Sequence, residues 1–217
     1  MEKLVLGSWE LDYRGKAYPV SVPGDVLIDL YKNGVIEDPY YAENLHVARQ
    51  YLEDVCTYRT KFDASYTGKC VELVFDGIDT YSEIYLNGRL LGKTENMFLQ
   101  YRFEVSEYLQ KKGNLLEVKM LPCSAFIDNE YHGRGVFNAQ RLQLRKAQCH
   151  FGWDWAPNLC GYGIWLPVRL KIHDGKRLRD VWLDPFINGK VNVYADVVGS
   201  GILEILASTK ADHKATS

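Results

Sequence analysis

Short segments in which apolar and polar residues alternate, separated by turn residues, dominate this sequence. Residues 70–75 and residues 116–120 both alternate in this way. Asn87-Gly88 lies between two apolar segments, and Asn-Gly is a strong signal for a β-hairpin because both turn positions need a positive φ. A period of two residues directs one face of each segment toward a core. The pattern therefore predicts an all-β fold.

Helical patterns are few in the sequence. Asp25 precedes an apolar segment at residues 26–31 that ends before Gly34, which predicts a short helix with an aspartate N-cap. Residues 43–52 predict a second short helix, and residues 106–112 predict a single helical turn. The helices are therefore expected to lie outside the β-sheets rather than to form the core.

A change of pattern near residues 173–176 predicts a domain boundary. Before it, residues 164–172 alternate as a strand, although Pro167 cannot donate to a sheet and requires an edge position or a bulge. After it come three strand-like segments, at residues 179–183, 190–197 and 202–207. Three strands are too few for an immunoglobulin-like sandwich, which needs about seven. We expect one domain over residues 1–175 and the truncated start of another over residues 176–217.

The charge balance and the cysteine count exclude several classes of protein. The 26 lysine and arginine residues nearly balance 28 aspartate and glutamate residues, which argues against nucleic-acid binding and against a basic membrane-binding face. No segment has the ~20 apolar residues of a membrane-spanning helix, and no signal peptide is recognisable, so a cytoplasmic location is expected. An odd number of cysteines without Cys-x-x-Cys spacing predicts reduced thiols: Cys56, Cys70, Cys123, Cys149 and Cys160.

Residues 145–165 carry the densest group of chemically distinctive side chains. Asp154 stands between Trp153 and Trp155, and glycines and a proline surround them, so a loop is expected. An ionised carboxylate can accept hydrogen bonds from two sugar hydroxyls, and an indole can cover the apolar face of a pyranose. In the alternative interpretation, both tryptophans are core anchors and Asp154 caps a turn. The residue types alone leave both open.

The order of motifs in the chain resembles a known family. Phe151 to Pro157 read Phe-Gly-Trp-Asp-Trp-Ala-Pro, and Gly163-Ile164-Trp165-x-Pro167-Val168 follows. This combination resembles the N-terminal domain of β-mannosidases of glycoside hydrolase family 2. Further matches within residues 7–173 occur in the same order, at residues 22–25, 38–41, 58–62, 75–80, 85–88, 96–98 and 101–103.

The resemblance implies both a fold and a role. It implies a jelly-roll β-sandwich of the galactose-binding-domain type, then an immunoglobulin-like β-sandwich, then a (β/α)₈ barrel with the two catalytic glutamates of a retaining exo-β-mannosidase. Such an enzyme hydrolyses terminal β-D-mannose residues of oligosaccharides without a cofactor. Asp154 matches an aspartate that reaches the barrel's active site and binds hydroxyls of the terminal sugar, and Trp153 and Trp155 would line that pocket. Asn44 matches an asparagine that faces the sugar in related β-galactosidases.

Two departures from the family pattern and two alternative functions accompany this interpretation. Ala156 replaces a usual glycine, and Leu166 replaces a usual arginine at a domain interface.

The chain could instead be a stand-alone carbohydrate-binding module without an enzyme. It could also belong to another family 2 exo-glycosidase, a β-galactosidase or a β-glucuronidase, because the barrel decides sugar specificity.

Catalysis and metal binding by this chain alone are not expected. A retaining glycosidase needs two carboxyl groups about 5–5.5 Å apart, and the spacing of Asp128, Glu130 and Asp154 favours no such pair. Cys149 and His150 are adjacent and would point to opposite faces of an extended chain, so no metal site is expected. The apolar strands after residue 176 lack a second sheet, which predicts either a dimer through them or poor order.

Overall fold

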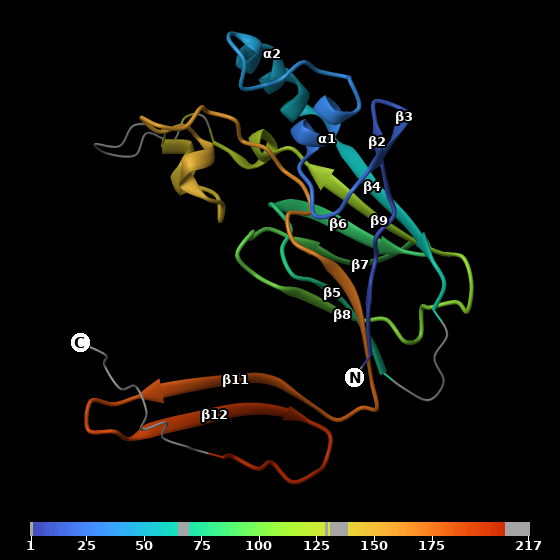
Figure 1. The fold of residues 1–217 in the computed structure, drawn as a ribbon, viewed down its shortest axis with the longest axis vertical. Coiled ribbons are helices and arrows are strands. Elements are labelled where there is room, and N and C mark those ends of the chain that lie inside the picture. Colours follow the sequence, from blue (N-terminus) through green and yellow to red (C-terminus); the bar gives the residue numbers. More distant parts are fainter. Residues whose placement is uncertain (1, 65–69, 129, 131–138, 207–217) are drawn as a thin grey trace, which may run out of the picture. The chain divides into compact units, whose positions relative to one another are not determined.

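The computed structural model describes residues 2–64, 70–128, 130 and 139–206 (Figure 1). The chain divides into two compact units, residues 1–172 and residues 173–217, and each is described here by itself. Within the described residues, every helix is too short or too polar to cross a membrane.

The first unit is a sandwich of two β-sheets. The six-stranded sheet has the order β3-β2-β4-β9-β6-β7, and its neighbouring strands are antiparallel. Its members are β2 (Trp9–Tyr13), β3 (Lys16–Val20), β4 (Cys56–Phe62), β6 (Tyr81–Leu86), β7 (Arg89–Thr94) and β9 (Asn114–Leu121). The four-stranded sheet, of order β1-β10-β5-β8, contains β1 (Glu2–Val5), β5 (Cys70–Phe75), β8 (Tyr101–Glu104) and β10 (Val168–His173). The chain changes sheet repeatedly between β4 and β10, as in jelly-roll folds, so the predicted all-β sandwich is confirmed.

The core lies between the two sheets. In β9 every second residue is buried, as predicted. In β5 residues 71–75 are all buried, so the alternation predicted for residues 70–75 is wrong; β5 is an inner strand of its sheet and is covered on both faces. Tyr58 and Val118 of the larger sheet and Leu73 of the smaller sheet belong to one buried cluster and have no exposed surface. The predicted hairpin is confirmed, since Asn87 and Gly88 both have positive φ, 52° and 79°, and join β6 to β7.

Two short helices lie beyond one end of the larger sheet (Figure 1). Helix α1 (Val26–Lys32) begins where the Asp25 carboxylate accepts a hydrogen bond from the Leu27 N–H at 2.9 Å, as the sequence predicts. Helix α2 (Asn44–Gln50) continues into the 3₁₀ helix η1 (Tyr51–Glu53), which confirms the second predicted helix.

Residues 106–112 contain the predicted single turn, with Val105 O accepting from the Tyr108 and Leu109 N–H groups. Another local prediction needs correction. The predicted strand at residues 164–172 begins only at Val168 as β10. Pro167 cannot donate to a ladder, and the preceding residues use their backbone groups for contacts outside the sheet, described below.

The described part of the second unit is a β-hairpin. Strands β11 (Arg177–Pro185) and β12 (Val191–Val198) pair in antiparallel register. Two of the three predicted strands are therefore present. Residues 202–206 of the third are not in a strand, and residue 207 lies outside the described residues. The immunoglobulin-like architecture of this unit stays a prediction.

Candidate functional site

The Trp-Asp-Trp segment forms a tight turn at the tip of a small hairpin-like loop. Phe151 and Asn158 form an antiparallel bridge at its base. Above the bridge, the Trp153 N–H donates to Ala156 O at 2.9 Å, and the Ala156 N–H donates to Trp153 O at 3.3 Å. These reciprocal bonds place Asp154 and Trp155 at the two central positions of a four-residue turn.

The turn presents its side chains to solvent. Asp154 is exposed, Trp153 is 42% exposed and Trp155 is 73% exposed. The alternative in which both tryptophans anchor the core is therefore wrong. The Arg141 guanidinium lies 4.9 Å from the Trp153 ring centroid, a cation–π contact that restricts this indole from outside the turn.

Backbone hydrogen bonds fix the segment that follows the turn. The Gly24 N–H donates to Ile164 O at 2.8 Å, and the Val26 N–H donates to Tyr162 O at 3.0 Å. On the other side, Asp79 and Gly163 exchange two backbone hydrogen bonds, at 2.9 and 2.8 Å. Residues 162–164 thus run between the start of α1 and the segment before β6, which is why they do not extend β10.

This close packing requires glycine at one position in particular. A Cβ atom added to Gly163 would lie 2.7 Å from Gly24 O and 2.9 Å from the Asp25 Cα. Both neighbours are backbone atoms, so no side-chain rotation would relieve the contact. Glycine at position 163 therefore allows the segment of residues 162–164 to pack closely between the start of α1 and the segment before β6. The sequence indicates only a loop there.

A buried ion pair lies beneath the same segment. The Lys146 ammonium donates to the Asp79 carboxylate and to Gly161 O, and the Lys146 side chain has no exposed surface. His150 Nδ1 lies 3.6 Å from Asp79 Oδ2, and burial together with the Lys146 charge lowers the His150 pKa. Burial also raises the pKa of Asp25 to about 6. Hydrogen bonds from backbone N–H groups of α1 and the charge of Lys146 lower this pKa, but by less than burial raises it. Because it bonds to both the Asp79 carboxylate and Gly161 O, Lys146 connects the segment that follows the Trp-Asp-Trp turn to the sandwich.

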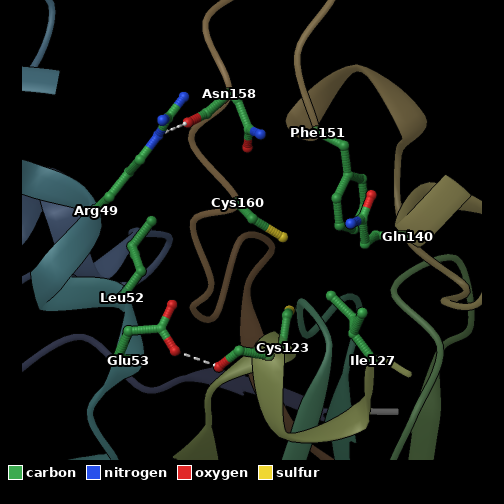
Figure 2. A pocket seen from close by; sticks show the side chains of 10 residues that line it. Arg49, Leu52, Glu53, Cys123, Ile127, Gln140, Phe151, Asn158 and Cys160 are labelled. Atoms are coloured by element: carbon green, nitrogen blue, oxygen red, sulfur yellow. Dashed lines mark hydrogen bonds between the residues drawn. The ribbon is translucent and has the colours of Figure 1, made fainter. Parts of the chain in front are cut away.

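Two hollows flank the base of the turn. The first, of about 270 Å³, is lined by Arg49 and Glu53 from the helices and by Phe151 and Asn158 from the bridge (Figure 2). Arg49 Nε closes its rim by donating to Asn158 O at 2.8 Å. The second hollow, of about 250 Å³, also borders the turn, and both polar and apolar side chains line it. It is lined by Asp25, Leu27, Ile28, Tyr40, Cys149, His150, Ala156, Pro157, Leu159 and Gly161.

The remaining predicted residues occupy other positions. The Asn44 side-chain amide donates to Asp38 O at 3.0 Å and lies 3.5 Å from Glu37 Oε2, so it stabilises its own loop. Cys149 and His150 lie in a 3₁₀ helix (Gln148–His150), so the extended chain expected there is wrong, and His150 Nδ1 lies 3.6 Å from Asp79 Oδ2. In the part of the chain that the structure describes, no three histidine, cysteine or acidic side chains are grouped to hold a metal ion.

Comparisons with known proteins agree with this architecture. The family described as "Glycosyl hydrolase 2 galactose-binding domain-like" matches residues 9–166. "Beta-mannosidase B" of Thermothelomyces thermophilus is 36% identical over 80% of this chain and 21% of its own length. "Beta-mannosidase B" of Neosartorya fischeri is 37% identical over 75% of this chain and 20% of its own length.

Solved structures give the same result. The crystal structure of a β-D-mannosidase from Dictyoglomus thermophilum superimposes with a TM-score of 0.81 at 38% identity, over 91% of this chain and 26% of that one. An exo-chitosanase from Amycolatopsis orientalis superimposes with a TM-score of 0.68 at 18% identity, over 91% of this chain and 24% of its own, and shows the fold alone. The chain thus spans about a fifth of the curated relatives' length. It belongs to the galactose-binding-domain-like family of glycosyl hydrolase 2 proteins.

Proposed function

We propose that this chain is the sugar-binding N-terminal part of a retaining exo-β-mannosidase, which removes terminal β-D-mannose residues from oligosaccharides. Two curated relatives and one solved structure that share 36–38% identity with the chain carry the name β-mannosidase. The chain spans only about a fifth to a quarter of these proteins, and the resemblance implies that the glutamates that cleave the bond lie in a barrel outside it. The 217-residue chain alone should therefore release no 4-nitrophenol from 4-nitrophenyl β-D-mannopyranoside.

The observation that carries the proposal is the presentation of Asp154 at the tip of the Trp153–Ala156 turn. Its exposed carboxylate can accept two hydrogen bonds from adjacent hydroxyls of a terminal sugar. The exposed indole of Trp155 offers an apolar face for the ring, and Arg141 holds the indole of Trp153 in place. A carboxylate that grips the terminal hydroxyls enforces exo action, because a substituted hydroxyl could not fit against it.

The test is the Asp154→Ala substitution in the intact protein. Each hydrogen bond to a charged group is worth about 1.5–3 kcal/mol, so the loss of two should lower kcat/KM for 4-nitrophenyl β-D-mannopyranoside by about 10²-fold or more. Glu107→Ala is the matched control, because Glu107 is an exposed carboxylate in the turn that follows β8. An unchanged kcat/KM in Asp154→Ala, with the control also unchanged, would refute the role of Asp154.

A further inference from the structure

Two cysteines from distant parts of the sequence meet in the first hollow at the base of the turn. Cys123 begins the 3₁₀ helix η2 (Cys123–Phe126) directly after β9, and Cys160 follows the Trp-Asp-Trp turn. Both are free thiols and both line the hollow of about 270 Å³ (Figure 2). Both also pack in one small apolar cluster with Leu144 and Phe151. The two sulfur atoms are therefore neighbours that share one opening.

The environment makes the two thiols unequal. A hydrogen bond with the Cys160 thiol lowers the pKa of Cys123, burial acts in the opposite direction, and the charge of Lys146 adds to the lowering, so that the pKa of Cys123 lies below its usual value. The same hydrogen bond, followed by burial, raises the pKa of Cys160. A thiolate is the reactive form of cysteine, so Cys123 is the thiol that reacts first, as the nucleophile, and Cys160 is the neighbouring thiol that reacts second.

We propose that Cys123 and Cys160 form a modification site at which hydrogen peroxide reversibly converts the two thiols into a disulfide. The Cys123 thiolate attacks one peroxide oxygen, the O–O bond breaks, hydroxide leaves and Cys123 becomes a sulfenic acid. The Cys160 sulfur then attacks the Cys123 sulfur, its proton goes to the departing hydroxyl group, and water leaves. The two sulfur atoms together lose two electrons, which reduce the peroxide to water and hydroxide.

The hollow selects a small oxidant. Cys123 is only 3% exposed, so a bulky disulfide reagent would meet the surrounding side chains before it met the sulfur. A cavity of about 270 Å³ does admit molecules of the size of water, each of which takes about 30 Å³ in the liquid. The new bond would tie the segment that follows the Trp-Asp-Trp turn to η2, at a place where the chain is otherwise irregular.

The experiment maps disulfides in the 217-residue chain after treatment with hydrogen peroxide. Free thiols are blocked with iodoacetamide, and trypsin is added without reductant. Cleavage after lysine and arginine places Cys123 in the peptide 120–134, whereas Cys149 and Cys160 share the peptide 147–169. We expect a linked pair of these peptides, lighter than their sum by two hydrogen atoms, which dithiothreitol separates.

Variants distinguish the two cysteines of the second peptide. Cys149→Ser is the matched control and should form the linked pair as the wild type does, because Cys149 lines the other hollow rather than the one that Cys123 and Cys160 share. Cys160→Ser should lose the linked pair, and Cys123 should then accumulate as sulfinic acid. The proposal is overturned if Cys149→Ser abolishes the link, or if peroxide leaves Cys123 and Cys160 fully alkylatable. The comparison of wild type with Cys149→Ser decides the matter even if Cys160→Ser fails to fold.

Discussion

Replacement of Lys146 by methionine should destabilise the sandwich more than any exposed lysine substitution. The Lys146 side chain has no exposed surface, and its ammonium bonds to the Asp79 carboxylate, which is 6% exposed, and to Gly161 O. Methionine has similar length but removes the ammonium that pairs with the buried Asp79 carboxylate, which keeps only the Thr80 hydroxyl and the nearby His150 ring; the loss of one partner of a buried ion pair costs about 3–5 kcal/mol. The unpaired Gly161 carbonyl adds about 1 kcal/mol. For a unit of 172 residues, this total corresponds to a fall in Tm of roughly 10 °C or more.

Urea unfolding followed by tryptophan fluorescence measures this loss. Lys112→Met is the control, since Lys112 is exposed and its replacement should change the free energy of unfolding by less than about 0.5 kcal/mol. The double variant Lys146→Met/Asp79→Asn should recover part of the loss, because it removes the charge that the single variant leaves buried. If Lys146→Met costs less than about 1 kcal/mol, or if the double variant shows simple additivity, the buried pair does not connect the loop to the core.

Three further predictions concern pH, close packing and association. Burial raises the pKa of Asp25 from 3.8 to about 6, so the folded state keeps a proton that the unfolded state has lost, and stability falls as pH rises through this window. Asp25→Asn should remove a fall of about 2 kcal/mol between pH 4 and pH 7 in urea titrations. Gly163→Ala should lower the free energy of unfolding by about 1–3 kcal/mol, while Gly7→Ala, with open space around it, should not. The exposed Leu183 faces Val193 across β11 and β12, so we expect a dimer by light scattering that Leu183→Lys dissociates.

The sequence by itself determined the features that depend on neighbouring residues. Alternation in β9, the positive φ of Asn87-Gly88 and the aspartate cap of α1 all act within a few residues, and the structure confirms each of them. The Trp-Asp-Trp segment is also a local signal, since its residue types and the surrounding glycines predict a loop, although they leave open whether its tryptophans contact a sugar or anchor the core. Its role in binding stays a prediction.

Only the tertiary structure decided how that loop is held. Lys146 and Asp79 lie 67 residues apart in sequence, and nothing near either residue indicates the other. The late start of β10 has the same origin, because the backbone groups of residues 162–164 form hydrogen bonds with those of Gly24, Val26 and Asp79. The meeting of Cys123 with Cys160 likewise depends on the order of strands in two sheets. Local propensities cannot specify such contacts, because the packing of the whole sandwich brings the partners together.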